Sequence, residues 1–220
     1  MHLLRGYGSI TMKCNRILIF RQKNNILYTM ESKETKNPLT KQIAITAVML
    51  AVCIISQFFK NLSVYITGPV VNLCIILTVM TAGLLWGVIL AVITPVTAFF
   101  IAASPVMTAV PLIIPFIMLG NTVLAVMTRL FFRPAVSGGK PLFSARSVIT
   151  ALLSAAAKGC FMGAAIALWL LPSFIPEASP LHEKMPVFQM MFSFTQFVTA
   201  IIGFVYFFII WLPLGRVLDS

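Results

Sequence analysis

Long uninterrupted apolar stretches constrain this chain more than any other feature of its sequence. A helix of roughly 20 predominantly apolar residues can cross a bilayer, and a soluble core would not need so many such stretches. A membrane β-barrel would instead show alternating segments of about ten residues, which are absent from the sequence. The composition agrees, because 60% of the 220 residues are hydrophobic and 10% are charged. The sequence therefore predicts an all-α integral membrane protein.

Six membrane crossings are expected, packed as a compact bundle over residues 38–217. The second crossing is short and leads through Gly83 almost directly into the third, and Thr94-Pro95 is expected to break the third near its centre. Polar or proline-rich segments separate the others, among them a loop over residues 133–146 that contains Gly-Gly. The expected bounds are about 41–59, 70–82, 84–102, 112–132, 147–171 and 187–214.

The charges indicate an orientation. The net charge is +11, and eight of the sixteen lysines and arginines lie in the first 41 residues. The positive-inside rule places this segment, the loop between the fourth and fifth crossings, and Arg216 in the cytoplasm. Both termini are therefore expected to be cytoplasmic, in a cell membrane. We interpret the basic excess as topology charges plus a tail, with no nucleic-acid partner.

The N-terminal tail, residues 1–37, is treated apart from the membrane domain. Residues 1–29 contain no apolar stretch of signal-peptide length followed by a small-residue cleavage site. A normal cytoplasmic start follows at Met30, so we expect translation to begin there. The alternative is that residues 1–29 form a disordered or interfacial basic arm.

Lys158 lies deep inside the fifth predicted crossing, near the middle of a hydrocarbon core about 30 Å thick. A charge there costs at least about 2.5–3.5 kcal/mol on insertion scales. No acidic residue within the crossings offsets it, because all five acids lie in tails or loops: Glu31, Glu34, Glu177, Glu183 and Asp219. One interpretation is a structural tie to carbonyls and side-chain amides. The other is that Lys158 lines a polar cavity and meets a ligand carboxylate or phosphate.

Other polar residues are expected at similar depth. Singly, each is consistent with an interhelical hydrogen bond, which is worth about 0.6 kcal/mol on average. Together with Lys158 they predict a wet substrate pocket open to the outside, formed by Gln57, Asn72, Thr94, Asn121 and Gln196. No metal site or cofactor is expected, because the four cysteines lack paired spacing.

Two stretches are suited to close helix packing. Gly159 and Gly163 have small-xxx-small spacing, and Ala44, Ala47 and Ala51 share one face of the first crossing. Small residues let helix backbones approach each other in lipid. Packing within the bundle explains both patterns equally well at this point.

The first crossing carries "AITAVMLA", followed by "TGPVVNLCIILTVMTAGLLWGVILAVITPVTAFF" and "PLIIPFIMLGN". The chain resembles the substrate-binding S components of energy-coupling factor transporters. The features that carry this resemblance are six helices, cytoplasmic termini, a short second helix, Gly83, Gly87, Thr94-Pro95 and Gly120-Asn121. The resemblance covers roughly residues 38–215. It implies a subunit that binds one vitamin or cofactor precursor from outside with high affinity. It also implies docking, through the alanine face, on a transmembrane coupling subunit driven by two ATPase subunits.

The resemblance implies no catalysis by the chain itself, and the sequence contains no Walker A motif or intramembrane carboxylate pair. Two other functions stay open: a membrane enzyme, such as an intramembrane protease or lipid-modifying transferase, and a stand-alone channel or scaffold. An enzyme would need an intramembrane nucleophile with a base, a carboxylate pair or a metal cluster.

Overall fold

The protein is described from a computed structural model, which covers residues 38–59, 64–136 and 142–218. The chain divides into two units, Met1–Lys41 and Gln42–Ser220. Of the first unit only Pro38–Lys41 is described, as the start of the first long helix. The predicted tail over residues 1–37 and the expected start at Met30 lie outside the described residues.

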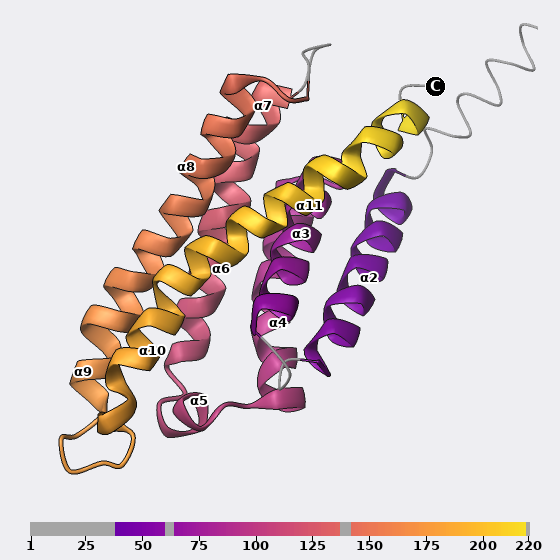
Figure 1. Cartoon of the computed structure of the whole chain (residues 1–220). Coiled ribbons are helices and arrows are strands. Elements are labelled where there is room, and N and C mark those ends of the chain that lie inside the picture. Colours follow the sequence, from indigo (N-terminus) through magenta and orange to yellow (C-terminus); the bar gives the residue numbers. More distant parts are fainter. Residues whose placement is uncertain (1–37, 60–63, 137–141, 219–220) are drawn as a thin grey trace, which may run out of the picture. The chain divides into compact units, whose positions relative to one another are not determined.

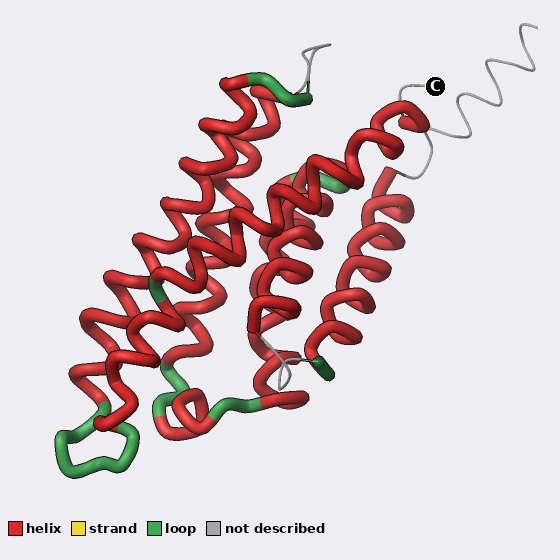
Figure 2. The backbone as a smooth tube through the Cα atoms, in the orientation of Figure 1, coloured by secondary structure: helices red, strands yellow, loops and turns green. Residues whose placement is uncertain are grey.

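The described part of the chain is all-α, with helices joined by short turns and loops and no strand (Figures 1 and 2). Six of its helical stretches are long and apolar enough to cross a membrane: Leu39–Gln57, Val64–Thr81, Leu84–Ala102, Ile113–Val136, Ala145–Phe174 and His182–Pro213. The expected fold class and the expected number of membrane-length apolar helices are therefore confirmed.

The individual elements refine these six stretches. The first three are single helices, whereas the last three contain π-helical turns, a short 3₁₀ turn or a break. In chain order the elements are α2 (Pro38–Gln57), α3 (Val64–Thr81), α4 (Leu84–Ala102), α5 (Pro105–Ala109), α6 (Ile113–Met127), η1 (Thr128–Phe132), α7 (Arg133–Val136), α8 (Ala145–Met162), η2 (Gly163–Leu170), α9 (Leu171–Phe174), η3 (His182–Lys184), α10 (Met185–Phe192) and α11 (Phe194–Leu218).

Three sequence expectations about helix ends and breaks were wrong. The second crossing is not short, because α3 begins at Val64 and continues through Pro69. The third crossing is not broken at Thr94-Pro95, because α4 continues through Pro95. The fourth continues through η1 into α7, so Arg133–Val136 is helical and not part of a loop. In an apolar environment a helix keeps its remaining backbone hydrogen bonds around a proline, since exposed backbone groups would find no water.

The sixth crossing contains a break that the sequence did not predict. Ser193 separates α10 from α11 with φ −116° and ψ −85°. The segment of the fifth crossing that packs against α10 is the π-helix η2. A Cβ added at Gly163, where η2 begins, would lie 3.1 Å from Ser193 Cβ. The two irregular segments therefore meet at one level of the bundle.

The helices of the second unit pack in a defined order. The helix α11 packs against α3 and α8, while α6 packs against α4 and α8 (Figure 1). The connection through α7 lies at the same end of the bundle as the end of α11, and the connection between α9 and α10 lies at the opposite end. The expected cytoplasmic location of the α7 end stays a prediction.

Close approach of α3 and α11 depends on small residues. A Cβ added at Gly68 would lie 2.9 Å from Thr199 Cγ2, and one added at Gly203 would lie 2.8 Å from Asn72 Cβ. Gly159 acts similarly between α8 and α11, since its added Cβ would lie 2.8 Å from Phe197 Cβ. Gly159 and Gly163, the small-xxx-small pair of the fifth crossing, therefore pack inside the bundle, which is the explanation that the sequence analysis offered.

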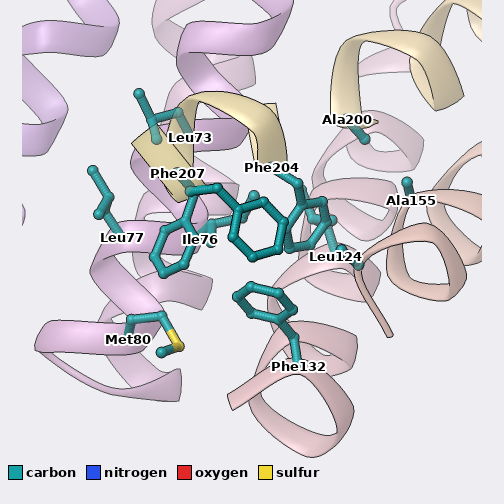
Figure 3. Close-up of a cluster of buried hydrophobic side chains, with 12 residues drawn as sticks. Leu73, Ile76, Leu77, Met80, Leu124, Phe132, Ala155, Ala200, Phe204 and Phe207 are labelled. Carbon is teal, nitrogen blue, oxygen red and sulfur yellow. The ribbon is translucent and has the colours of Figure 1, made fainter. Parts of the chain in front are cut away.

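An aromatic cluster forms the core near the end of α6. Phe132 is fully buried and makes edge contacts with Phe204 at 4.9 Å and Phe207 at 5.3 Å between ring centroids (Figure 3). A second core cluster fills the opposite half around Ile166 and Phe188. A third joins α2, α3, α4 and α6 and contains the buried Cys53 and Cys74.

Candidate functional site

One polar cavity collects all six residues that the sequence predicted for a substrate site. Its volume is about 120 Å³. Each of the six long helical stretches contributes one of these residues: Gln57 from α2, Asn72 from α3, Thr94 from α4, Asn121 from α6, Lys158 from α8 and Gln196 from α11. Residues as far apart in the sequence as Gln57 and Gln196 therefore surround one space.

Lys158 is held by two asparagine side chains at the cavity wall. Its side chain is 2% exposed, and Nζ donates to Asn72 Oδ1 at 2.6 Å and to Asn121 Oδ1 at 2.7 Å. The lysine thus ties α8 to both α3 and α6. This is the structural tie to side-chain amides that the sequence left open. The same side chain also lines the cavity, so the tie does not remove it from a ligand's reach.

Asn121 is oriented by a backbone carbonyl of α4. Its Nδ2 lies 3.5 Å from the carbonyl oxygen of Ala91, a long and weak bond. In a regular helix, that carbonyl would accept a hydrogen bond from the N–H of the residue four positions later. This residue is Pro95, which has no N–H. Pro95 does not break α4, but it leaves an acceptor for Asn121. The Asn121 oxygen is thereby directed toward Lys158.

Asn72 is oriented by a hydroxyl of α11. Its Nδ2 donates to Thr199 Oγ1 at 3.4 Å, while its Oδ1 accepts from Lys158. The sequence analysis missed Thr199, which is fully buried. A signal was present, because Gln196 and Thr199 are three residues apart and so share a helix face. Two asparagines therefore present their oxygens to one lysine, each fixed by a different neighbouring helix.

Gln57 and Thr94 form another part of the wall. Gln57 Nε2 donates to the carbonyl oxygen of Thr94 at 3.0 Å, which joins α2 to α4. Both side chains are almost fully buried, at 1% and 2% exposure. Gln57 Oε1 and Thr94 Oγ1 nevertheless have no hydrogen-bond partner among the described residues. Such orphaned groups are uncommon in protein interiors.

Gln196 borders the cavity close to the break in the sixth crossing. Its Nε2 donates to the carbonyl oxygen of Met191 at 3.3 Å, across Ser193. Thr67 and Gly68 also line the cavity, although the sequence analysis assigned them to a polar connection. They were missed because α3 was expected to begin only at Val70. Thr67 donates to the carbonyl oxygen of Ser56 at 3.1 Å, next to Gln57.

A larger groove lies elsewhere, with a volume of about 610 Å³. It is lined mainly by small and apolar residues of α8, η2 and α11, including Gly159, Ala164 and Phe197. Exposed side chains such as Cys160 and Leu168 border it. An apolar groove on an outer face of membrane helices is suited to lipid chains, whereas binding specificity requires placed polar groups. We therefore assign the candidate site to the smaller polar cavity.

The predicted docking face lies on the outside of α2. Ala44, Ala47 and Ala51 are all exposed, whereas Cys53 and Gln57 on the other side of the helix are buried. In the part of the chain that the structure describes, no group of three or more histidine, cysteine, aspartate or glutamate side chains could hold a metal ion.

No protein-family model, no curated protein and no solved structure matches this chain. Its function must therefore be argued from the cavity and from the surface of the bundle.

Proposed function

We propose that the chain is the high-affinity substrate-binding subunit of an energy-coupling factor type importer for a vitamin or cofactor precursor in the cell membrane. The observation that carries the proposal is the polar cavity to which each of the six long helical stretches contributes at least one polar side chain. Ionisable residues within a membrane are costly, and they characteristically mark substrate and ion pathways. A cavity with a buried lysine and orphaned polar atoms is a reasonable binding site for a polar small molecule.

The surface of α2 supports a docking partner. Of the six candidate spans, the one in α2 has the smallest buried share. Its exposed stripe of alanines would let another helix approach closely, because lipid provides no hydrophobic force between helices and packing must supply the attraction. In the proposed complex this stripe contacts the transmembrane coupling subunit, which two ATPase subunits drive. The chain itself would bind the substrate and hydrolyse nothing.

Purification of the full chain from its native membranes tests the proposal. The expected result is that a transmembrane coupling subunit and two ATPases copurify, and that mass spectrometry detects a small molecule released from the complex. Replacing Ala47 and Ala51 by tryptophan should remove the coupling and ATPase subunits but leave the small molecule bound, because neither residue lines the cavity.

Leu152→Trp is the matched control, since Leu152 is 44% exposed on α8. It should retain both the subunits and the small molecule. If no ATPase copurifies with the wild-type chain, the importer function is wrong, and a stand-alone channel, scaffold or membrane enzyme is favoured. If the alanine variants retain the ATPases, the alanine stripe is not the docking surface.

A further inference from the structure

The orphaned atoms of the cavity have defined chemical requirements. Gln57 Nε2 already donates to a backbone carbonyl oxygen, and rotating the amide by 180° would place two acceptors against each other. The orientation of Gln57 is therefore fixed, and its Oε1 can only accept a hydrogen bond. Oε1 has no donor among the described residues. An occupant must offer an N–H or O–H group to satisfy it.

The Lys158 side of the cavity has the opposite requirement. Two hydrogens of a lysine ammonium are used by Asn72 and Asn121, and the described residues provide no acceptor for the third. Lys158 is the one ionisable side chain among the described residues that line the cavity. An occupant with a single negative charge would balance it, whereas a doubly charged group would bury an unpaired charge.

The two requirements apply to different parts of the cavity wall. Through Asn121 the Lys158 side is connected to α4 at the carbonyl of Ala91. Gln57 is connected to α4 at the carbonyl of Thr94. These carbonyls are three residues apart, or about 4.5 Å along the helix axis. The donor side and the acceptor side of the wall are therefore attached to α4 at two different positions along that helix.

The volume limits the size of the occupant. A single water molecule needs about 10–15 Å³ of such a cavity. A cavity of about 120 Å³ therefore has room for on the order of ten water-sized atoms. Sites for drug-sized ligands are typically about 300–1,000 Å³. A flavin, a folate or a corrinoid would not fit entirely within this cavity.

We propose that the cavity binds a compact organic monocarboxylate whose carboxylate faces Lys158 and whose N–H or O–H group faces Gln57 Oε1. This rests on the proposed function in one respect, that the cavity is the substrate site. The substrate class is then a small acid of about ten non-hydrogen atoms with a hydrogen-bond donor away from the acid group. The acid group alone, or the donor alone, satisfies only one side of the cavity.

Calorimetric binding to the full chain, freed of any copurified molecule, tests this substrate class with matched probes. The probes are 3- and 4-hydroxybenzoate, benzoate without the donor, and the two hydroxybenzamides without the charge. We expect at least one hydroxybenzoate to bind about tenfold more tightly than benzoate and about tenfold more tightly than its amide. This ordering needs no variant, so it does not depend on a mutant that folds.

Two variants assign the preferences to residues. Gln57→Met should abolish the preference for the hydroxyl group and keep the preference for the acid. Lys158→Met should do the reverse. The substrate class is overturned if the wild-type chain binds no probe at millimolar concentration, if it binds all of them equally, or if Gln57→Met keeps the hydroxyl preference. A cavity that holds only water gives the first of these results.

Failure of this inference is distinguishable from failure of the proposed function. If the probe ordering is observed but no ATPase copurifies with the chain, the importer function fails and the substrate class stands. If the ATPases copurify but the released molecule is large or uncharged, the substrate class fails and the importer function stands.

Discussion

Lys158 Nζ donates to Asn72 Oδ1 at 2.6 Å, and this bond joins α8 to α3 across 86 positions of the sequence. Asn72 is held in turn by Thr199 of α11, so three helices meet through two side-chain contacts. The lysine is therefore part of the structure of the bundle even when the cavity is empty. Its cost in the membrane is offset by oxygens that are already in place.

Lys158→Met should destabilise the folded bundle. Hydrogen bonds to charged groups are worth about 1.5–3 kcal/mol each, so two of them contribute about 3–6 kcal/mol. Removing the central charge recovers only about 2.5–3.5 kcal/mol on insertion scales. The midpoints of the two ranges differ by about 1.5 kcal/mol, so we expect a net loss of about that size, measured as a lower melting temperature of the ligand-free protein in detergent. Membrane insertion of the isolated α8 segment should become more favourable in the variant, because the central charge is gone. The substitution thus has opposite effects on insertion and on the stability of the folded bundle.

Lys184→Met is the control, because Lys184 is exposed in the connection between α9 and α10. It should leave the melting temperature unchanged. A Lys158→Met protein that melts at or above the wild-type temperature would show that the two asparagine contacts do not stabilise the bundle.

Pro95→Ala should separate stability from binding. Alanine restores an N–H that can donate to the carbonyl of Ala91, so the helix gains a hydrogen bond and the melting temperature should stay equal or rise. The same N–H competes with Asn121 for that carbonyl. Loss of one positioning hydrogen bond, about 0.5–1.5 kcal/mol, corresponds to roughly twofold to tenfold weaker binding of the hydroxybenzoate probes.

Pro213→Ala provides the comparison, since Pro213 lies inside α11, is exposed, and does not line the cavity. Its binding of the probes should match the wild type. Equal binding by Pro95→Ala and the wild type would mean that the Ala91 carbonyl does not position Asn121.

The six helices could be predicted because each depends on a local property. An apolar stretch of membrane length is visible within the sequence itself, and the cost of a charge in the bilayer identifies Lys158 without any structure. Position along each predicted helix then indicated a similar depth in the membrane for the other polar residues, which are Gln57, Asn72, Thr94, Asn121 and Gln196. Their convergence on one cavity was a hypothesis about helix faces, and the structure does bring all six together.

The partners of these residues could not be predicted, because they depend on how the helices rotate and approach. Thr199 meets Asn72 only because Gly203 allows α11 to lie against α3. The break at Ser193 and the π-helical turns of η2 follow from packing between two segments. The second crossing was predicted too short because Gly68-Pro69 is typical of a turn in water, whereas in the bundle this pair continues a buried helix.

Gly203→Ala should displace α11 from α3. The added Cβ would lie 2.8 Å from Asn72 Cβ and 3.2 Å from the Pro69 carbonyl oxygen, so the backbones must move apart. Overpacking of this kind costs about 1–3 kcal/mol, and it should also weaken the hold of Thr199 on Asn72. Val205→Ile adds one carbon on the exposed face of the same helix and should change little. Thermal melting of both variants tests this expectation. If Gly203→Ala melts at the same temperature as Val205→Ile, α3 and α11 do not depend on the close contact at Gly203.

Phe131 and Phe132 form a matched pair for testing the core near the end of α6. Phe132 is fully buried, whereas Phe131 is 44% exposed on the same segment. Phe132 contacts Phe204, Phe207 and Phe208 with ring centroids 4.9, 5.3 and 5.7 Å away. Since lipid is as apolar as the core, Phe132→Ala loses packing rather than burial from water, and we expect about 2–3 kcal/mol, less than in soluble proteins.

Phe131→Ala should cost at most about 0.5 kcal/mol, as is usual for exposed positions. Titration of each variant with a denaturing detergent measures the difference. Neither phenylalanine lines the cavity, so the folded fraction of both variants should bind the hydroxybenzoate probes like the wild type. Equal destabilisation by the two substitutions would show that the aromatic cluster does not hold the end of α6 against α11.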